Sequence, residues 1–280
     1  MTTYIIGIGL IGGSFALSLR EHKLSDKILG YDASPKNLDR AIELGLIDQK
    51  ADIDEGVKEA DLIVLTTPVD VTPILATKIL NKVRPDQIVI DMGSIKEELC
   101  EVISMHANRS RFVATHPMWG TENSGPDAAE KGAFKGRTVV ICEKDRSDAK
   151  AVAAIENIYT TLGMPIIYMD AEEHDLHVAY ISHISHITSF ALALTVLEKE
   201  REERHIFSLA GGGFESTVRL AKSSASTWIP ILMRNKYNVL DVLREHIHQL
   251  QVMRKALEAD DRDALLNMMN KANTIKEIIE

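Results

Sequence analysis

The sequence predicts an α/β protein in which an N-terminal Rossmann dinucleotide-binding domain precedes an all-α domain. Two patterns support this fold class. Short apolar runs alternate with amphipathic stretches through the first part of the chain, which is typical of a mostly parallel sheet with helices on both faces. After Asp170 the strand-like runs cease and helical periodicity continues. We therefore expect a nucleotide-binding domain over residues 1–168 and a helical substrate and dimerisation domain over residues 169–280.

The first segment of the chain is the most informative one. An apolar run ends in the turn GIGLIG at residues 7–12, a helical pattern follows, and a second apolar run ends at Asp32. Here Gly7 permits a tight turn, Gly9 lets the backbone approach a pyrophosphate, and Gly12 lets the helix pack on the strand. The helix N-terminus offers N–H groups to phosphates, and Asp32 can accept hydrogen bonds from a ribose diol. Because an acid there repels a 2′-phosphate, the sequence favours NAD over NADP. A glycine turn without a ligand would leave Asp32 unexplained.

The other expected elements continue the alternation. We expect strands at residues 28–31, 62–66, 88–91, 112–115, 138–141 and 165–168, and helices at 36–44, 71–80, 95–106 and 149–162. In the second half we expect one long helix from Glu172 into the charged run at 198–204, and an interruption at Gly211–Gly213. Further helices are expected at 217–222, 227–234, 238–259 and from Arg262 to the end.

Composition excludes several classes of protein. The 280 residues are 45% hydrophobic and 26% charged, as in an ordinary globular protein, and no apolar run is expected to span a membrane. Residues 1–14 belong to the first strand and turn, so we expect no signal peptide. Cys100 and Cys142 lack zinc or CxxC spacing and are expected to be buried, reduced thiols of a cytoplasmic protein. A net charge of −9 argues against a nucleic-acid partner, and an anionic substrate would need a local cation.

Two strand ends carry candidate catalytic side chains, because ligands bind at the carboxyl ends of the strands in such sheets. His116 follows one strand and can take a proton from a hydroxyl while hydride leaves the same carbon. The alternative is a loop histidine bonded to backbone. Ser94 follows another strand and can hydrogen-bond the same hydroxyl or His116. Ser94 is also a suitable helix N-cap, with Glu97 completing a capping box, and the two roles are compatible.

The segment Ser182-His183-Ile184-Ser185-His186 lies inside an apolar helix. Ser182 and His186 are four residues apart and share a face. Since buried polar groups need partners, this cluster indicates a polar pocket. A metal site formed by histidines is the rival interpretation. We expect no metal, because His177 and His186 lie on opposite faces and no carboxylate completes a set with His174 and His183.

Arg219 and Trp228 form the last candidate group. A guanidinium can hold a carboxylate by two parallel hydrogen bonds. A solvated helix face is the alternative for a single arginine. The Gly211–Gly213 turn just before it, and the need of an acidic protein for a local cation, favour the binding role.

Taken together, these segments resemble the prephenate dehydrogenase family of tyrosine biosynthesis over nearly the whole chain. The resemblance rests on five ordered motifs: the GxGxxGGS turn, Asp-x-Gly-Ser-x-Lys at 91–96, His-Pro-Met-x-Gly-Thr-Glu at 116–122, Ser-His-x-x-His at 182–186, and Gly-Gly-Gly-Phe followed by Arg-x-Ala-Lys-Ser at 211–223. It implies a cytoplasmic homodimer, paired through the helical domain, that decarboxylates prephenate oxidatively with NAD.

The resemblance also implies roles for individual residues. His116 would be the base and Ser94 its partner, and Arg219 would bind a substrate carboxylate. The pocket would be lined by Ser182, His183, His186 and Trp228, with Gly120, Thr121 and Glu122 at its mouth. The cofactor would contact Gly7, Gly9, Leu10, Ile11, Gly12, Asp32, Thr66, Thr67, Pro68 and Val69.

Two positions depart from the family pattern. Ser216 stands where an aspartate is frequent, and Trp119 where a smaller or different residue is common. The closest rival function is arogenate dehydrogenase, which runs the same reaction on an amino substrate. More distant rivals are a hydroxyacid or pyrroline-carboxylate type of reductase and a catalytically silent NAD sensor.

Overall fold

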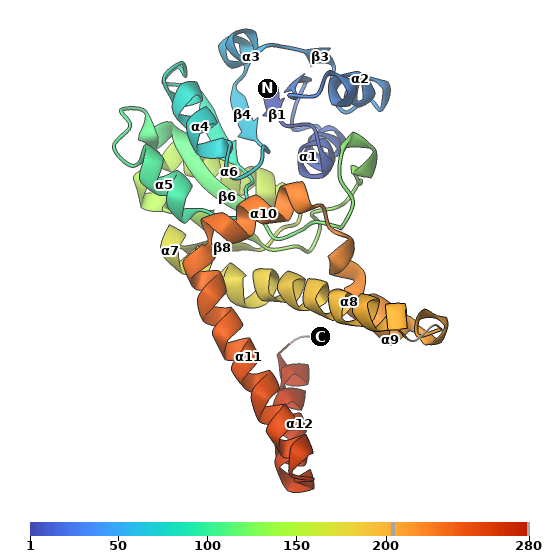
Figure 1. Cartoon of the computed structure of the whole chain (residues 1–280). Helices are drawn as coiled ribbons and strands as arrows, with labels where there is room; N and C mark the ends of the chain where they lie inside the picture. The colour runs from blue at the N-terminus through green and yellow to red at the C-terminus, as the bar shows by residue number, and fades with distance from the viewer. Residues whose placement is uncertain (203–204, 279–280) are drawn as a thin grey trace. The chain divides into compact units, whose positions relative to one another are not determined.

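The computed structural model describes residues 1–202 and 205–278, and its first compact unit, Met1–Asn235, is built on one eight-stranded sheet (Figure 1). The strand order is β3-β2-β1-β4-β5-β6-β7-β8, and every neighbouring pair is parallel except β6 with β7. After β3 at one edge, the chain crosses over the sheet, and β4 pairs with the other side of β1. This reversal of strand order confirms the expected Rossmann domain. The strands are β1 (Thr2–Ile6), β2 (Lys27–Tyr31), β3 (Gln49–Lys50), β4 (Leu62–Leu65), β5 (Ile88–Asp91), β6 (Phe112–Pro117), β7 (Val139–Cys142) and β8 (Ile166–Met169).

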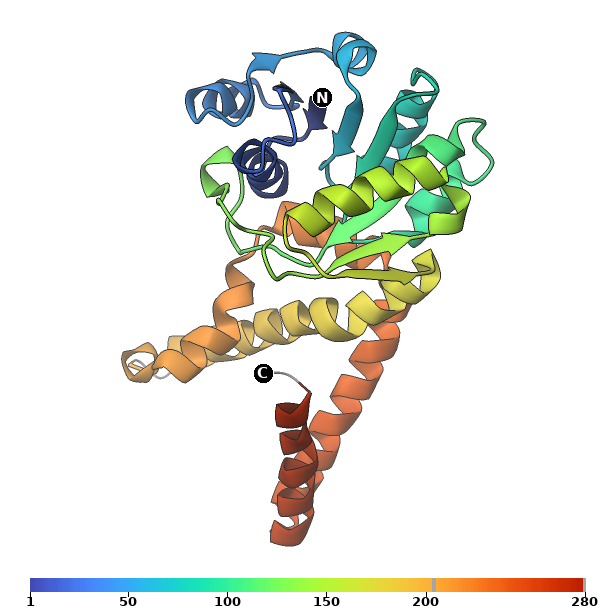
Figure 2. The ribbon, with the colours of Figure 1, turned by 180° about the vertical axis from the view of Figure 1, so that it is seen from behind.

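Helices cover both faces of the sheet because successive side chains of a strand point to opposite faces. On β1, Ile5 packs with Phe15 and Tyr159 in one core, whereas Tyr4 and Ile6 belong to the core on the other face. Figure 1 shows α4 and α5 in front of the sheet. Figure 2, the view from the opposite side, shows α6 in front of it. These helices are α1 (Leu10–Glu21), α2 (Pro35–Glu43), α3 (Ile53–Glu59), α4 (Thr72–Leu80), α5 (Glu97–Ile103) and α6 (Ala149–Thr161).

Helix α1 packs closely on the sheet at Gly12, a position that has no side chain. A Cβ placed on Gly12 would be 2.2 Å from the carbonyl oxygen of Gly7 and 2.7 Å from Oγ1 of Thr66. Neither neighbour can move freely, because the first is backbone and the second donates a hydrogen bond to it. The close packing of α1 therefore requires glycine at this position.

The helical part of the first unit follows β8. Its elements are α7 (Ala171–Val178), a π-helical turn η4 (Ala179–His183), α8 (Ile184–Glu202), α9 (Gly212–Val218), a 3-10 turn η6 (Arg219–Lys222) and α10 (Ala225–Arg234). The long helix expected from Glu172 forms as one continuous stretch, and it contains the π turn, which carries Ser182 and His183. Such insertions occur frequently at functional sites. The end of the expected helix at 203–204 lies outside the described residues.

The interruption expected at Gly211–Gly213 and the helix expected at 217–222 were wrong, because α9 already begins at Gly212 and is followed by the turn η6.

Other local predictions also differ from the structure. Strand β6 continues through Pro117 because antiparallel β7 pairs Val140 with His116, so the histidine lies in the strand and not beyond it. Helix α5 begins at Glu97 and not at residue 95. The strand β3 was not predicted, since an exposed dipeptide gives no periodic signal. The seven-residue helix α3 was not predicted either.

The second compact unit, Lys236–Glu280, contains helices α11 (Lys236–Glu258) and α12 (Arg262–Asn273). The side chain of Asp261 caps α12 by accepting a hydrogen bond from the N–H of Ala264 at 2.9 Å. Both helices were predicted. The last two residues of the expected terminal helix, 279–280, lie outside the described residues.

One helical stretch, Ala171–Arg201, has the length and composition of a membrane span. The prediction that no segment reaches this length was wrong, because the serines and histidines of the stretch interrupt its apolar run without adding full charges. A single such helix is weak support for a membrane. His174 and His183 of this stretch are buried within the first unit and hydrogen-bonded there.

We expect Gly12→Ala to lower the free energy of unfolding by about 1–3 kcal/mol, since its methyl group displaces backbone. Gly9→Ala is the matched control, because a Cβ on Gly9 has open space within 4 Å. Urea unfolding followed by circular dichroism measures both variants. Equal stability of the two would contradict the close contact at Gly12.

Candidate active site

A cavity of about 460 Å³ opens at the carboxyl ends of β1, β4, β5 and β6, and all of its lining belongs to the first unit. Strand ends supply one wall and the helical region the other. The strand-end lining consists of Gly9, Leu10, Ile11, Thr66, Thr67, Pro68, Val69, Met92, Gly93, Ser94, His116 and residues 118–125. The helical lining consists of Ser182, His183, His186, Leu220, Ser223, Ser224, Thr227, Trp228 and Ile231.

The glycine turn forms one end of this cavity. Gly7 has a φ of +101°, and a Cβ there would be 2.6 Å from the carbonyl oxygen of Thr66. The hydroxyl of Thr66 donates to the carbonyl oxygen of Gly7 at 2.5 Å and so ties β4 to the turn. Helix α1 starts immediately afterwards, and Gly9 caps it without a side chain. The turn thus leaves N–H groups and open space at the helix N-terminus, which is the arrangement that binds a phosphate.

Asp32 lies at the end of β2, next to this turn. Its Oδ2 accepts the N–H of Ile8 at 2.9 Å, and its Oδ1 accepts the N–H of Ser34 at 2.8 Å. The side-chain amide of Asn37 donates to the same Oδ1 at 3.2 Å. These contacts fix the orientation of the carboxylate and leave it capacity to accept from a diol. Asn37 had no assigned role in the sequence analysis.

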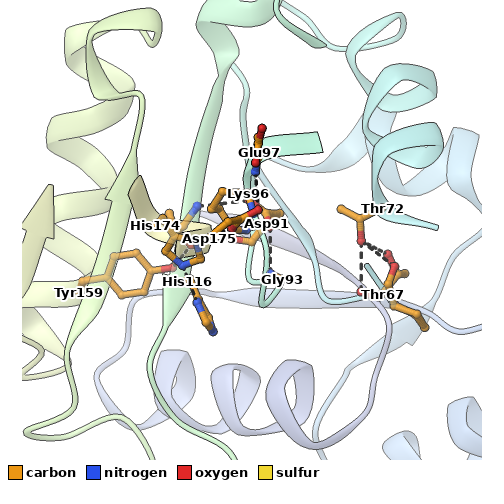
Figure 3. Close-up of polar contacts among 12 residues, drawn as sticks. Thr67, Thr72, Asp91, Gly93, Lys96, Glu97, His116, Tyr159, His174 and Asp175 are labelled. Carbon is orange, nitrogen blue, oxygen red and sulfur yellow. Dashed lines mark hydrogen bonds and ion pairs between the residues drawn. The ribbon is translucent and has the colours of Figure 1, made fainter. Parts of the chain in front are cut away.

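His116 projects from β6 into the cavity, and one of its ring nitrogens is already bonded. Its Nδ1 lies 2.8 Å from Nε2 of His174, whose Nδ1 lies 2.7 Å from Oδ1 of Asp175 (Figure 3). Burial lowers the pKa of His116 well below its usual value, and His174, Lys96 and His183 lower it further. The ring is therefore neutral near pH 7, which a proton acceptor requires.

A fully buried ion pair lies beneath this group. The ammonium of Lys96 contacts Oδ2 of Asp91, which also accepts the N–H of Gly93 at 2.9 Å. The other oxygen of Asp91 accepts the N–H of Thr115 at 3.2 Å, so the pair joins β5 to β6. Figure 3 shows the pair beside His174 and Asp175. Both residues stand in the 91–96 motif, but the sequence analysis assigned a role only to Ser94.

The expected capping box at Ser94 was wrong. Helix α5 has no side-chain cap of its own, because the carboxylate of Asp175 on α7 takes that place. Asp175 accepts the N–H of Lys96 at 2.7 Å through Oδ1 and the N–H of Glu97 at 3.0 Å through Oδ2. Ser94 lines the cavity, and among the described residues no hydrogen bond joins it to His116.

The helical wall presents neutral rings to the cavity. His186 stacks on Trp228 with ring centroids 3.4 Å apart, and its Nδ1 lies 3.1 Å from the backbone carbonyl oxygen of Ser182. The amide of Asn235 lies 3.2 Å from Nδ1 of His183 and donates to the carbonyl oxygen of Asp175 at 2.7 Å. Burial lowers the pKa of His183 to about 4 and also lowers that of His186. Asn235 was not singled out by the sequence analysis, because it lies between two predicted helices.

Two predicted site residues, Arg219 and Glu122, pair with each other at the rim. The guanidinium of Arg219 lies 2.7 Å from Oε2 of Glu122, and the Arg219 side chain is 51% exposed. Gly120, Thr121 and Glu122 line the cavity. Leu220 lines it as well, whereas the preceding residue, Arg219, lies outside the lining. An anion entering the cavity would compete with Glu122 for this guanidinium.

Among residues 1–202 and 205–278, no group of three or more histidine, cysteine, aspartate or glutamate side chains is arranged to hold a metal ion. The polar side chains that line the cavity near its strand-end and helical walls include the imidazoles of His116, His183 and His186 and the hydroxyls of several serines and threonines. This set suits hydride and proton transfer with a bound nucleotide.

Comparisons with known proteins agree with this geometry. The family model for the nucleotide-binding domain of prephenate dehydrogenase matches residues 15–168, and the model for its dimerization domain matches residues 170–271. The prephenate dehydrogenase of Bacillus subtilis is 30% identical over 99% of this chain and 75% of its own length. The cyclohexadienyl dehydrogenase of Zymomonas mobilis is 33% identical over 94% of this chain and 90% of its own.

Solved structures give the same assignment. Prephenate dehydrogenase from A. aeolicus, in complex with hydroxyphenyl propionate and NAD+, superposes with a TM-score of 0.89 at 28% identity, covering 100% of this chain and 98% of that one. Arogenate dehydrogenase of Synechocystis shares the fold, with a TM-score of 0.77 at 24% identity and full coverage of both chains. The chain therefore belongs to the prephenate dehydrogenase family of oxidoreductases.

Proposed function

We propose that this protein catalyses the NAD-dependent oxidative decarboxylation of prephenate to 4-hydroxyphenylpyruvate. The observation that carries the proposal is the half-buried ring of His116, which is hydrogen-bonded to His174 and faces a cavity between the glycine turn and a polar helical wall. The relatives named prephenate dehydrogenase support the substrate class, and the A. aeolicus complex supports the cofactor.

The residues present fit NAD. The open space beside Gly9 and the N-terminus of α1, with Leu10 and Ile11, suit the pyrophosphate. The fixed carboxylate of Asp32 suits the adenosine ribose diol and disfavours a 2′-phosphate. Thr66, Thr67, Pro68 and Val69 line the path toward Ser94 and His116. NAD, when bound, supplies the acceptor for a hydride.

His116 then performs the proton transfer. Prephenate carries a hydroxyl and a hydrogen on one ring carbon, and that hydrogen leaves as hydride. His116 takes the hydroxyl proton, and a carbonyl forms on the ring. The electron pair of the breaking C–CO₂ bond moves through the ring to this oxygen, which regains the proton from His116 as the ring becomes aromatic. We assign to Ser94, which lines the cavity, a hydrogen bond to the same oxygen.

We assign the anionic groups of the substrate to Arg219, with Ser182, His183, His186 and Trp228 lining the pocket and Gly120 and Thr121 at its mouth. Arg219 offers a planar fork of donors that carboxylates match. The carboxylate of Glu122 holds this fork at the rim. Binding therefore includes an exchange of one carboxylate for another.

We infer further that the protein is a cytoplasmic homodimer, with the division between nucleotide-binding and helical domains at residues 168/169. The dimerization-domain match supports pairing through the helical region. Exposed apolar side chains on α8 and α10 support it too, among them Leu194, Ile229 and Met233. Both cysteines are buried and free, as in a reducing compartment.

The test of the function is NADH formation by the purified protein, followed by absorbance, with prephenate and with arogenate and with NAD and NADP. Turnover of prephenate with NAD supports the proposal. Turnover of arogenate alone would replace the substrate and keep the mechanism. NAD binding without turnover of either compound would favour a sensor.

We expect His116→Asn to lower kcat by about 100- to 10,000-fold, the range of general acid–base catalysis, because the base is lost. The dissociation constant for NAD should stay within about threefold of the wild type, since His116 is not in the glycine turn. Steady-state kinetics and calorimetry measure the two quantities. A kcat close to that of the wild type would remove His116 from the mechanism.

The pH profile of kcat/KM should retain its plateau below pH 6.5, the usual pKa of histidine. Protonation removes the base, and since the pKa of His116 lies well below its usual value, this loss occurs only at more acidic pH. Buffers that overlap between pH 4.5 and pH 8 test the position of the acid limb. Half the activity already lost near pH 6.5 would show that His116 is not the titrating base.

Arg219→Ala should raise KM for prephenate by about 10- to 100-fold with a smaller change in kcat, because a carboxylate contact acts in ground and transition states alike. Lys222→Ala is the matched control. It removes a positive charge from the same turn η6, so its KM should change much less. Equal effects of the two variants would indicate general electrostatics and place the carboxylate site elsewhere.

A further inference from the structure

Hydrogen bonds link three side chains in a row, from Asp175 and His174 on α7 to His116 on β6. His174 is fully buried and Asp175 is 2% exposed, and both lie beneath His116 and away from the cavity. The contacts run from Nδ1 of His116 to Nε2 of His174 at 2.8 Å, and from Nδ1 of His174 to Oδ1 of Asp175 at 2.7 Å. Neither residue of α7 lines the cavity, so a role of either in the reaction must pass through residues that do.

The order of donors along this chain follows from its last member. Both oxygens of the Asp175 carboxylate accept backbone N–H groups, so it acts as an acceptor toward His174 as well. The hydrogen of His174 must then reside on Nδ1, which leaves Nε2 with a lone pair. That lone pair can only accept, so Nδ1 of His116 must donate to it. In neutral His116 the remaining nitrogen, Nε2, carries the free lone pair.

We propose that Asp175 is a positioning residue which, acting through His174, holds His116 in the tautomer whose Nε2 accepts the substrate proton. The proposal rests on the function proposed above. In the other tautomer Nε2 would carry a hydrogen and could not act as a base. The same carboxylate would then stabilise the imidazolium that forms during the reaction, because it lies at the far end of the chain.

The second oxygen of Asp175 extends the role to the other catalytic candidate. The N–H groups of Lys96 and Glu97, which Asp175 accepts, follow Ser94 by two and three residues. One carboxylate therefore fixes both the start of α5, with the Ser94 segment before it, and the ring of His174. Ser94 follows β5 and His116 belongs to β6, and the contacts of Asp175 fix the position of one relative to the other.

Other charged and titratable groups also face His116 and His174. Lys96 and Asp91 approach from β5 and the loop after it, and His183 approaches from η4. Lys96 and Asp91 are paired with each other, and Nδ1 of His183 contacts the amide of Asn235. Asp175 is thus the carboxylate that makes a direct contact with His174.

The experiment uses two substitutions of His174 in the full chain. In His174→Gln, the amide oxygen can accept from Nδ1 of His116 while the amide nitrogen donates to Asp175, so the polarity of the chain is kept. In His174→Met, a side chain of similar size offers no such acceptor. Asp175→Asn is made in parallel, although it also weakens the cap of α5.

Nitrogen-15 NMR of histidine-labelled protein at pH 8 reports the tautomer of each ring without turnover, and the spectrum of His116→Asn assigns the His116 signals. We expect His116 to carry its hydrogen on Nδ1 in the wild type and in His174→Gln. In His174→Met we expect the hydrogen to populate Nε2. A wild-type His116 with its hydrogen on Nε2 would overturn the proposal.

Kinetics provide the second readout. His174→Met should lose at least about 100-fold in kcat while KM and NAD affinity change by less than about threefold, and His174→Gln should recover most of the loss. Equal losses in both variants, or a kcat for His174→Met within threefold of the wild type, would overturn the proposal. If no cyclohexadienyl substrate is turned over, the proposed function fails, and the NMR result still decides the tautomer assignment.

Discussion

The carboxylate of Asp175 is the contact on which the arrangement of the site depends. It is almost completely buried and receives three hydrogen bonds, two from the backbone at the start of α5 and one from His174. A buried carboxylate without such partners would be costly, so these donors and Asp175 require one another. Through them the first helix after the sheet is joined to the loop of Ser94 and to the strand of His116.

Burial sets the protonation states in the cavity. His116, His174, His183 and His186 all have pKa values below the usual one, chiefly because the surrounding protein disfavours charge. The cavity thus combines neutral imidazoles with a cation, Arg219, kept at its rim by Glu122. This separation suits a reaction in which a neutral base removes a proton while an anionic substrate is held at its carboxylate. It also explains how a chain with a net charge of −9 accommodates such a substrate.

The helix from Ala171 to Arg201 serves both the site and the surface. Its inner side carries Asp175, His174, His183 and His186, whereas apolar residues such as Leu194 and Leu197 are exposed. The π turn at Ala179–His183 brings Ser182 and His183 to the cavity together with His186, which lies one turn further along. Together with the dimer contact proposed for its outer side, the active-site wall accounts for the apolar composition of this helix.

The Rossmann sheet, the helical region and the segments that line the cavity could be predicted from the sequence, because the spacing of apolar residues and the glycine turn are local properties of the chain. His116 and the 182–186 helix were identified for the same reason. The structure alone decided that Asp175 caps α5, that His174 holds His116, that Asn235 joins α7 to His183, and that Glu122 occupies Arg219. These pairings join residues 52 to 97 positions apart. Apolar periodicity records which face of an element is buried, but not which polar group of a distant element meets it there, so the positioning of the site emerged only from the tertiary fold.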